Sequence, residues 1–193
     1  MNPKDPQWGS CALVAYLPDP LGAYLTALRH SMPGERTESH LTFLPPRTLA
    51  GPRAAAAAIA GERLGQSAVI EIELSGIEIF PRTNVLYVAI EKGRRELQSL
   101  HAALNQGALH ANEPFEYWPH ITIGGPYSEA EARSLFPRVE ESWRAFSHSR
   151  CFSVAEVVFL WQPGKLCDRE WTRLSTFTLM RSEAFSRNAA NRT

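Results

Sequence analysis

His40 and His120 each begin the same four-residue motif: histidine, an apolar residue, threonine and another apolar residue. The threonines are Thr42 and Thr122. In an extended strand, residues two positions apart lie on one face, about 6 to 7 Å from each other, and the residue between them points to the opposite face. Each motif therefore predicts a strand that carries an imidazole and a hydroxyl side by side and packs apolar side chains on its other face.

Two such strands facing one groove would supply acid–base catalysis at a phosphate ester. A neutral imidazole can take a proton from water or a ribose hydroxyl as it attacks phosphorus, and a protonated imidazole can give a proton to the departing oxygen. The ordinary pKa of histidine, about 6.5, suits both roles. Threonine hydroxyls can donate hydrogen bonds to the non-bridging oxygens. We therefore predict that His40 and His120 are the catalytic pair and that Thr42 and Thr122 bind phosphate, with no metal or other cofactor.

Two other interpretations of these residues stay open. The groove could bind a nucleotide or phosphate without turnover, because a fold and a pocket do not guarantee chemistry. Retention of both histidines and both threonines favours the enzyme, since binding alone would tolerate arginine or lysine. The histidines could instead be metal ligands, but such sites usually recruit further histidine, cysteine or carboxylate ligands, and the residues two positions along are threonines.

Three residues near the motifs are secondary candidates. Arg47 follows the first motif, where its guanidinium could reach a phosphate in the groove, although a solvated loop arginine explains it almost as well. Tyr117 and Trp118 precede the second motif and could stack on a base. Packing between the lobes is the alternative for both aromatic residues.

The charge balance excludes a strongly basic nucleic-acid-binding protein. The 193 residues contain 20 Lys plus Arg and 20 Asp plus Glu, so the formal net charge is zero, whereas a protein that makes many phosphate contacts with long nucleic acid usually carries a basic excess. The expected partner is therefore a small nucleotide or the phosphate at an RNA end.

We expect a cytosolic protein with no membrane partner. The first ten residues lack a basic-then-apolar signal pattern, and the apolar runs are too short to span a bilayer. The 3 cysteines show no CxxC spacing, which favours buried free thiols over a disulfide framework or a zinc knuckle.

The hydrophobic periodicity and the turn residues predict the elements that must position the motifs. The predicted strands are 11–17, 39–44, 69–80, 85–90, 120–123, 152–161 and 171–180, and the predicted helices are 21–29, 52–64, 94–109 and 128–146. Pro45 and Pro46 are expected to stop the second strand, and Gly76 is expected to cause a bulge or a bend. Ser128 and Glu131 form a plausible capping box for the last helix.

The order of these elements repeats, with each motif on the second strand of its half. We predict an α+β fold of two lobes, built from duplicated strand-helix-strand-helix-strand units with mainly antiparallel or mixed sheets around a central groove and helices outside. The whole chain, 1–193, would form a single bilobal domain. The first repeat would span about 11–80 and the second about 85–180, and the tail, 182–193, would be frayed.

The sequence around both motifs resembles the two-histidine (2H) phosphoesterases, and within them the bacterial 2'-5' RNA ligase-like or RNA 2',3'-cyclic phosphodiesterase branch. The resemblance rests on segments 40–47 (HLTFLPPR) and 114–123 (PFEYWPHITI) and on the opening segment 12–16 (ALVAY) with the prolines that follow it. It implies a two-lobed, metal-independent fold whose members open 2',3'-cyclic phosphates, cleave related cyclic phosphates or join RNA ends through a 2'-5' linkage. We therefore expect a monomeric hydrolase of a cyclic or 2'-5' phosphodiester.

Overall fold

The computed structural model describes residues 9–49, 51–163 and 171–180. Within these residues, the chain forms eight strands, four α-helices and one short 3-10 helix. The strands are β1 (Gly9–Tyr16), β2 (His40–Thr48), β3 (Ile70–Ile79), β4 (Leu86–Lys92), β5 (His120–Gly124), β6 (Cys151–Val154), β7 (Glu156–Pro163) and β8 (Thr172–Thr178). The helices are α1 (Leu21–His30), α2 (Arg53–Gly65), α3 (Arg94–Leu104), the 3-10 helix η1 (Gly107–Leu109) and α4 (Glu129–Ala145).

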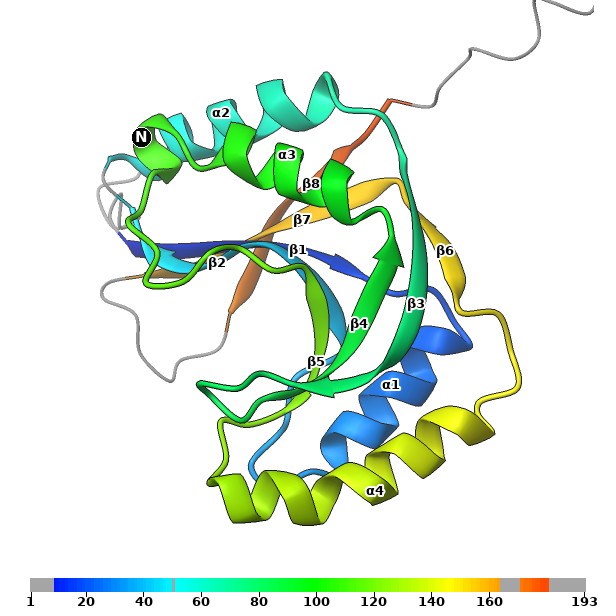
Figure 1. Ribbon diagram of the computed structural model, residues 1–193. Coiled ribbons are helices and arrows are strands. Elements are labelled where there is room, and N and C mark those ends of the chain that lie inside the picture. Colours follow the sequence, from blue (N-terminus) through cyan, green and yellow to red (C-terminus); the bar gives the residue numbers. More distant parts are fainter. Residues whose placement is uncertain (1–8, 50, 164–170, 181–193) are drawn as a thin grey trace, which may run out of the picture.

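All eight strands belong to one sheet, in the order β6-β3-β4-β5-β2-β1-β7-β8. Every pair of neighbouring strands in the sheet is antiparallel. The sheet curls strongly, and the helices lie on its outside (Figure 1). The predicted α+β class is confirmed. The order is symmetric about the contact between β5 and β2, the two motif strands, which therefore occupy the centre of the sheet.

The helices form two pairs, and each pair covers half of the sheet (Figure 1). Helices α2 and α3 pack together over β8 and β2, whereas α1 packs on β5 and α4 packs on β3. Helices α1 and α4 are joined by a hydrogen bond from the Tyr24 hydroxyl to the Ser142 carbonyl. Each motif strand is thus backed by a helix from the other half of the chain: α1 lies behind β5, and α3 lies behind β2.

The prediction that Pro45 and Pro46 end the second strand is wrong, because β2 continues to Thr48. The register against β1 shifts across the two prolines, from Leu44 opposite Leu13 to Arg47 opposite Cys11. On the other side, the described β2–β5 ladder consists of one pair that lies well before the prolines. Proline is tolerated where no ladder partner needs its missing N–H, so the strand continues through a shifted register.

Two other predicted elements are divided. The predicted strand 152–161 is two strands that are separated at Ala155: β6 pairs with β3 at one edge of the sheet, and β7 pairs with β1 in the opposite half. The predicted helix 94–109 ends at Leu104, and η1 follows after a break at Asn105, with Gly107 at a positive φ of 55°. The register against β4 shifts between Leu74 and Ile77, around Gly76, where a bulge or bend was predicted, and the predicted capping box of Ser128 and Glu131 is confirmed.

The core lies between the sheet and the helices and includes the apolar residues of both motifs. Leu41, Phe43, Ile121 and Ile123 are all 0% exposed, so their burial fixes which face of each strand carries the histidine and threonine. Cys11 is buried, but Cys151 is exposed, contrary to the expectation of buried thiols. The third cysteine and the predicted frayed tail lie outside the described residues.

Candidate active site

The two motifs lie side by side on adjacent antiparallel strands. Leu41 of β2 pairs with Ile121 of β5. Continued by one residue in each direction, this register sets His40 across from Thr122 and Thr42 across from His120. Residues directly opposite in such a pair have Cβ atoms about 4.5–5.5 Å apart. The structure therefore brings the four predicted residues together on the face opposite the core. We call this cluster, in which each histidine lies across from the threonine of the other motif, the crossed square.

Backbone carbonyls orient both imidazoles in the same way. His40 Nδ1 lies 2.8 Å from the carbonyl oxygen of Glu38, and His120 Nδ1 lies 2.6 Å from that of Trp118. A carbonyl oxygen can only accept, so each Nδ1 must carry the hydrogen. The Nε2 atom of each neutral ring is then the free base. His120 Nε2 lies 3.1 Å from Thr122 Oγ1, which is the hydroxyl of its own motif.

Burial favours the neutral form of both half-buried imidazoles. It lowers the pKa of His40, and the positive charges of Arg29 and His120 act in the same direction, whereas the hydrogen bond to Glu38 and the Glu35 carboxylate oppose them. Burial also lowers the pKa of His120, and so does the positive charge of Arg29. The hydrogen bond to the Trp118 carbonyl raises this pKa and opposes them. Both histidines are therefore suited to act as bases near neutrality.

An aromatic ring and an ion pair flank His40. Tyr16 pairs with His40 across the β1–β2 ladder, and their ring centroids are 6.3 Å apart in an edge-to-face arrangement. The Arg173 guanidinium lies 4.2 Å from the Tyr16 ring centroid and 2.9 Å from a Glu38 carboxylate oxygen. The side chains of Arg173 and Glu38 are exposed, so a cation lies over an aromatic ring beside the first motif.

The surroundings of His120 are more aromatic. Phe80 and Tyr87 stack on each other at 4.0 Å, and both meet His120 edge-to-face, at 4.9 Å and 5.4 Å. Tyr87 faces Thr122 across the β4–β5 ladder and donates a hydrogen bond to Glu78. Burial, together with this carboxylate, raises the pKa of the Tyr87 hydroxyl well above its ordinary value. The hydroxyl is therefore a hydrogen-bond donor at physiological pH.

Arg47 is held inside the protein. It is 5% exposed, and its guanidinium donates to the Pro45 carbonyl, the Asn105 side chain, the Leu109 carbonyl and the Glu113 carboxylate. These contacts tie the end of β2 to segment 105–113. Because they occupy the guanidinium within the protein, Arg47 is not included in the phosphate site proposed below.

Tyr117 and Trp118 lie in different environments. Tyr117 stacks on His101 at 3.9 Å with the planes 4° apart, and its hydroxyl donates to the Thr42 carbonyl at 2.6 Å. These contacts match the packing alternative. His101 covers one face of the Tyr117 ring, so that face is not available to a base. Trp118 is 37% exposed, and the Arg94 guanidinium lies 4.4 Å from its ring centroid. Of the two, Trp118 is the one available to a ligand.

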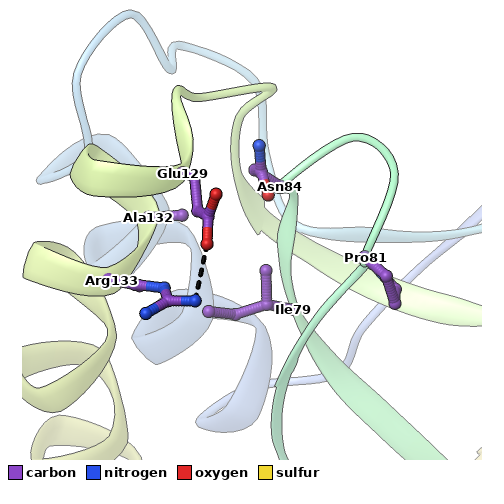
Figure 2. A pocket seen from close by; sticks show the side chains of 6 residues that line it. All are labelled: Ile79, Pro81, Asn84, Glu129, Ala132 and Arg133. Atoms are coloured by element: carbon purple, nitrogen blue, oxygen red, sulfur yellow. Dashed lines mark ion pairs between the residues drawn. The ribbon is translucent and has the colours of Figure 1, made fainter.

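A separate surface hollow of about 420 Å³ lies between the β3–β4 turn and the start of α4 (Figure 2). Figure 2 shows the ion pair of Arg133 and Glu129, 2.5 Å long, at this hollow. It is lined by Ile79, Pro81, Asn84, Glu129, Ala132 and Arg133. Since it contains none of the motif residues and no imidazole, the hollow is distinct from the candidate active site.

Two further features of the described residues bear on the site and its setting. No group of three or more His, Cys, Asp or Glu side chains is placed to hold a metal ion in the part of the chain that the structure describes. Within those same residues, no helix has both the length and the apolar character needed to cross a membrane.

The family model for the 2'-5' RNA ligase superfamily matches residues 17–166, which include both motifs. The chain belongs to this superfamily. The match is consistent with membership of the wider 2H phosphoesterase group, which the sequence resembles around both motifs. No curated protein sequence matches the chain significantly.

Solved structures of the superfamily's fold align over nearly the whole chain. E. coli LigT in its apo form is 18% identical, with a TM-score of 0.59 over 90% of this chain and 98% of LigT. E. coli LigT complexed with 3'-AMP is 19% identical, with a TM-score of 0.60 and the same coverage. Kluyveromyces marxianus Usb1 is 12% identical, with a TM-score of 0.50 over 92% of this chain and 100% of that chain. At these identities the likeness shows the fold.

Several neighbours of the motifs were not singled out from the sequence. Tyr16 and Tyr87 looked like ordinary strand residues, and their position beside the histidines depends on strand pairing. Arg29 carried a detectable signal: it lies four residues after Leu25 on the buried stripe of α1, where a charged residue is unusual. His101 carried the same signal, because it lies four residues after Leu97 on the buried stripe of α3.

Proposed function

We propose that this member of the superfamily is a metal-independent phosphoesterase that acts on 2',3'-cyclic phosphate ends of RNA or on related cyclic or 2'-5' phosphodiesters. The observation that carries the proposal is the crossed square of two histidines and two threonines, with both Nδ1 atoms committed to carbonyls and both Nε2 atoms left as the reactive nitrogens. This arrangement offers two equivalent proton-transfer groups about a phosphate-sized space.

In the proposed reaction, one neutral imidazole accepts a proton at Nε2 from a water molecule as the water oxygen bonds to phosphorus. The bond between phosphorus and the ribose oxygen breaks, and the other imidazole, protonated at Nε2, gives that oxygen its proton. Burial keeps both free imidazoles neutral, but a bound phosphodiester anion favours the charged form of the ring that it touches. The substrate thereby creates the acid that its own cleavage requires.

The threonine hydroxyls would hold the non-bridging oxygens. Thr122 Oγ1 already lies beside His120 Nε2, and the strand register puts Thr42 across from the same histidine. Donors fixed on two central strands need little reorganisation as charge develops on these oxygens. The four groups come from one chain, so we propose that a monomer suffices.

The substrate class rests on family membership and on size. LigT, whose fold this chain shares, has been solved in complexes with 3'-AMP and with ATP, and zero net charge in this protein suits a terminal phosphate better than long RNA. Exposed Trp118 offers a flat surface two residues before His120 on which a base could stack.

The deciding experiment is turnover of the four nucleoside 2',3'-cyclic phosphates in excess chelator, with His40→Ala and His120→Ala as controls. We expect product with its phosphate on the 2' oxygen, and loss of activity in both variants. Activity that disappears with the chelator and returns with a metal ion would contradict metal-independent catalysis. Nucleotide binding without turnover of any of the four compounds would favour the alternative, a non-catalytic binding module that uses the same groove.

A further inference from the structure

Arg29 is a buried charge directly behind the second motif. It lies in the last turn of α1 and is 8% exposed. Its Nε and Nη2 atoms contact Glu35 Oε2 at 2.8 Å and 2.6 Å, and its Nη1 donates to the Thr122 carbonyl at 3.2 Å. One guanidinium therefore joins a loop carboxylate to the backbone of a predicted phosphate-binding residue.

Stability alone is a weak reason for such a pair. Removing two charges from water costs several kcal/mol for each ion, and well-packed apolar residues in the same space are often as stabilising. The apolar stripe of α1 reaches Arg29 from Leu21 and Leu25, so an apolar side chain at this position would simply continue the stripe. A guanidinium in its place suggests a role at the site that it touches.

We propose that Arg29, held by Glu35, is a positioning residue that serves both histidines, by fixing the Thr122 carbonyl and by keeping a permanent positive charge behind the two imidazoles. This inference rests on the proposed function, because it assigns Arg29 to the acid–base machinery. Thr122 connects Arg29 to both rings: its hydroxyl contacts His120 Nε2, and His40 lies across the ladder from it.

The charges around the two histidines make the role testable. Arg29 lowers the pKa of both rings, whereas Glu35 raises that of His40. The other groups that face His40 are the Glu38 carbonyl and His120 itself, with the Tyr16 ring at its edge and the Arg173–Glu38 ion pair close by.

His120 has a different set of neighbours. It faces the Trp118 carbonyl, the Thr122 hydroxyl, Phe80, and Tyr87 with its bound Glu78. Substitutions at Arg29 and Glu35 should therefore give different patterns at the two rings.

The test is an NMR titration of the histidine Cε1–H signals in the free protein, assigned with the two histidine-to-alanine variants. Arg29→Met should raise the pKa of both His40 and His120, and Arg29→Lys, which keeps the charge, should restore much of the shift. Glu35→Gln should lower the pKa of His40 and leave that of His120 unchanged. A folded Arg29→Met protein in which neither pKa moves would overturn the proposal.

Folding is checked by circular dichroism. If Arg29→Met does not fold, a double variant with Glu35→Gln leaves no unpaired carboxylate, and the pKa of His120 in that protein must still rise. The kinetic counterpart is the pH profile with a cyclic phosphate, in which both limbs should move to higher pH in Arg29→Met. Wild-type protein that turns over no cyclic phosphate would count against the proposed function, whereas the titration would still decide the role of Arg29.

Discussion

The helix-covered sides of the two motif strands, which we call their backs, are built alike but carry different charged groups. Behind β5, the last turn of α1 supplies Arg29, which pairs with Glu35 and contacts the Thr122 carbonyl. Behind β2, the last turn of α3 supplies His101, which donates from Nδ1 to the Phe43 carbonyl and lies 3.4 Å from Glu113 through Nε2. In both places a basic side chain near the end of a helix contacts a motif strand from the other half of the chain. The same side chain contacts a glutamate in the segment between that helix and the next strand.

The two backs differ in the number of groups that the charged side chains contact. Glu113 also receives Arg47, which in turn binds Asn105 and the Leu109 carbonyl, so the back of β2 is a wide structural network. Behind β5 there is a single ion pair, in which Arg29 lowers the pKa of both histidines and Glu35 raises that of His40. Two equal motifs thus receive unequal support, which should separate the roles of the two histidines.

The largest expected effect comes from removing either imidazole. His40→Ala and His120→Ala should each lower the rate by roughly 10² to 10⁴ without loss of the fold, because general acid–base catalysis contributes about that much. Each variant should also lose one limb of a bell-shaped pH profile, and the limb lost identifies that histidine as base or acid. Wild-type rates that are flat from about pH 5 to 9, with chemistry rate-limiting, would count against the pair.

Arg47→Met should break the network behind β2. We expect a loss of up to about 3–5 kcal/mol in the free energy of unfolding, measured by urea denaturation, because the largely buried Glu113 would lose its guanidinium partner and keep only the contact with His101. Arg82→Met, at an exposed arginine, is the matched control and should change stability by about 0.5 kcal/mol or less. Unchanged stability with weakened nucleotide binding would instead restore Arg47 to the phosphate site.

Thr122→Val and Thr42→Val test the crossed square. Each should lower kcat by about 10², since each would remove a donor to the developing charge. Of the two threonines, only Thr122 has a hydrogen-bond contact with an imidazole in the described structure, so its variant should also move a limb of the pH profile. Equal pH profiles in the two variants would show that this contact has no electrostatic consequence.

Tyr117→Phe removes only the hydroxyl that donates to the Thr42 carbonyl. The ring would stay stacked on His101, so we expect a loss of about 0.5–1.5 kcal/mol in unfolding free energy and little change in rate. A large change in kcat with stability unchanged would place Tyr117 in contact with substrate.

The smallest effect is a pH dependence of stability at the motifs. Both folded-state histidines have a lowered pKa, so the unfolded chain binds more protons as pH falls through about 6.5. Stability should therefore decrease below that pH, and urea titrations of a protein lacking both imidazoles should show a weaker decrease. An equal decrease in that protein would assign the effect to other groups.

Much of the fold was predictable from local patterns. Alternating apolar residues indicated the motif strands, and the capping box located the start of α4. The errors lie where tertiary pairing outweighs local signals: β2 passes through two prolines because its register against β1 shifts there. The strand after α4 divides because its two parts pair in different halves of the sheet. The division of the chain into repeats at 11–80 and 85–180 stays a prediction.

The sequence by itself singled out the four side chains that we propose hold the chemistry, because the two-residue spacing of a strand puts each histidine and its threonine on one face. Only the tertiary structure decided that each histidine lies across from the other motif's threonine, that Arg29 lies behind β5, and that Arg47 faces inward. Spacing along one strand is a local property of the backbone. The register between strands, and the helix that covers them, depend on how the whole core packs.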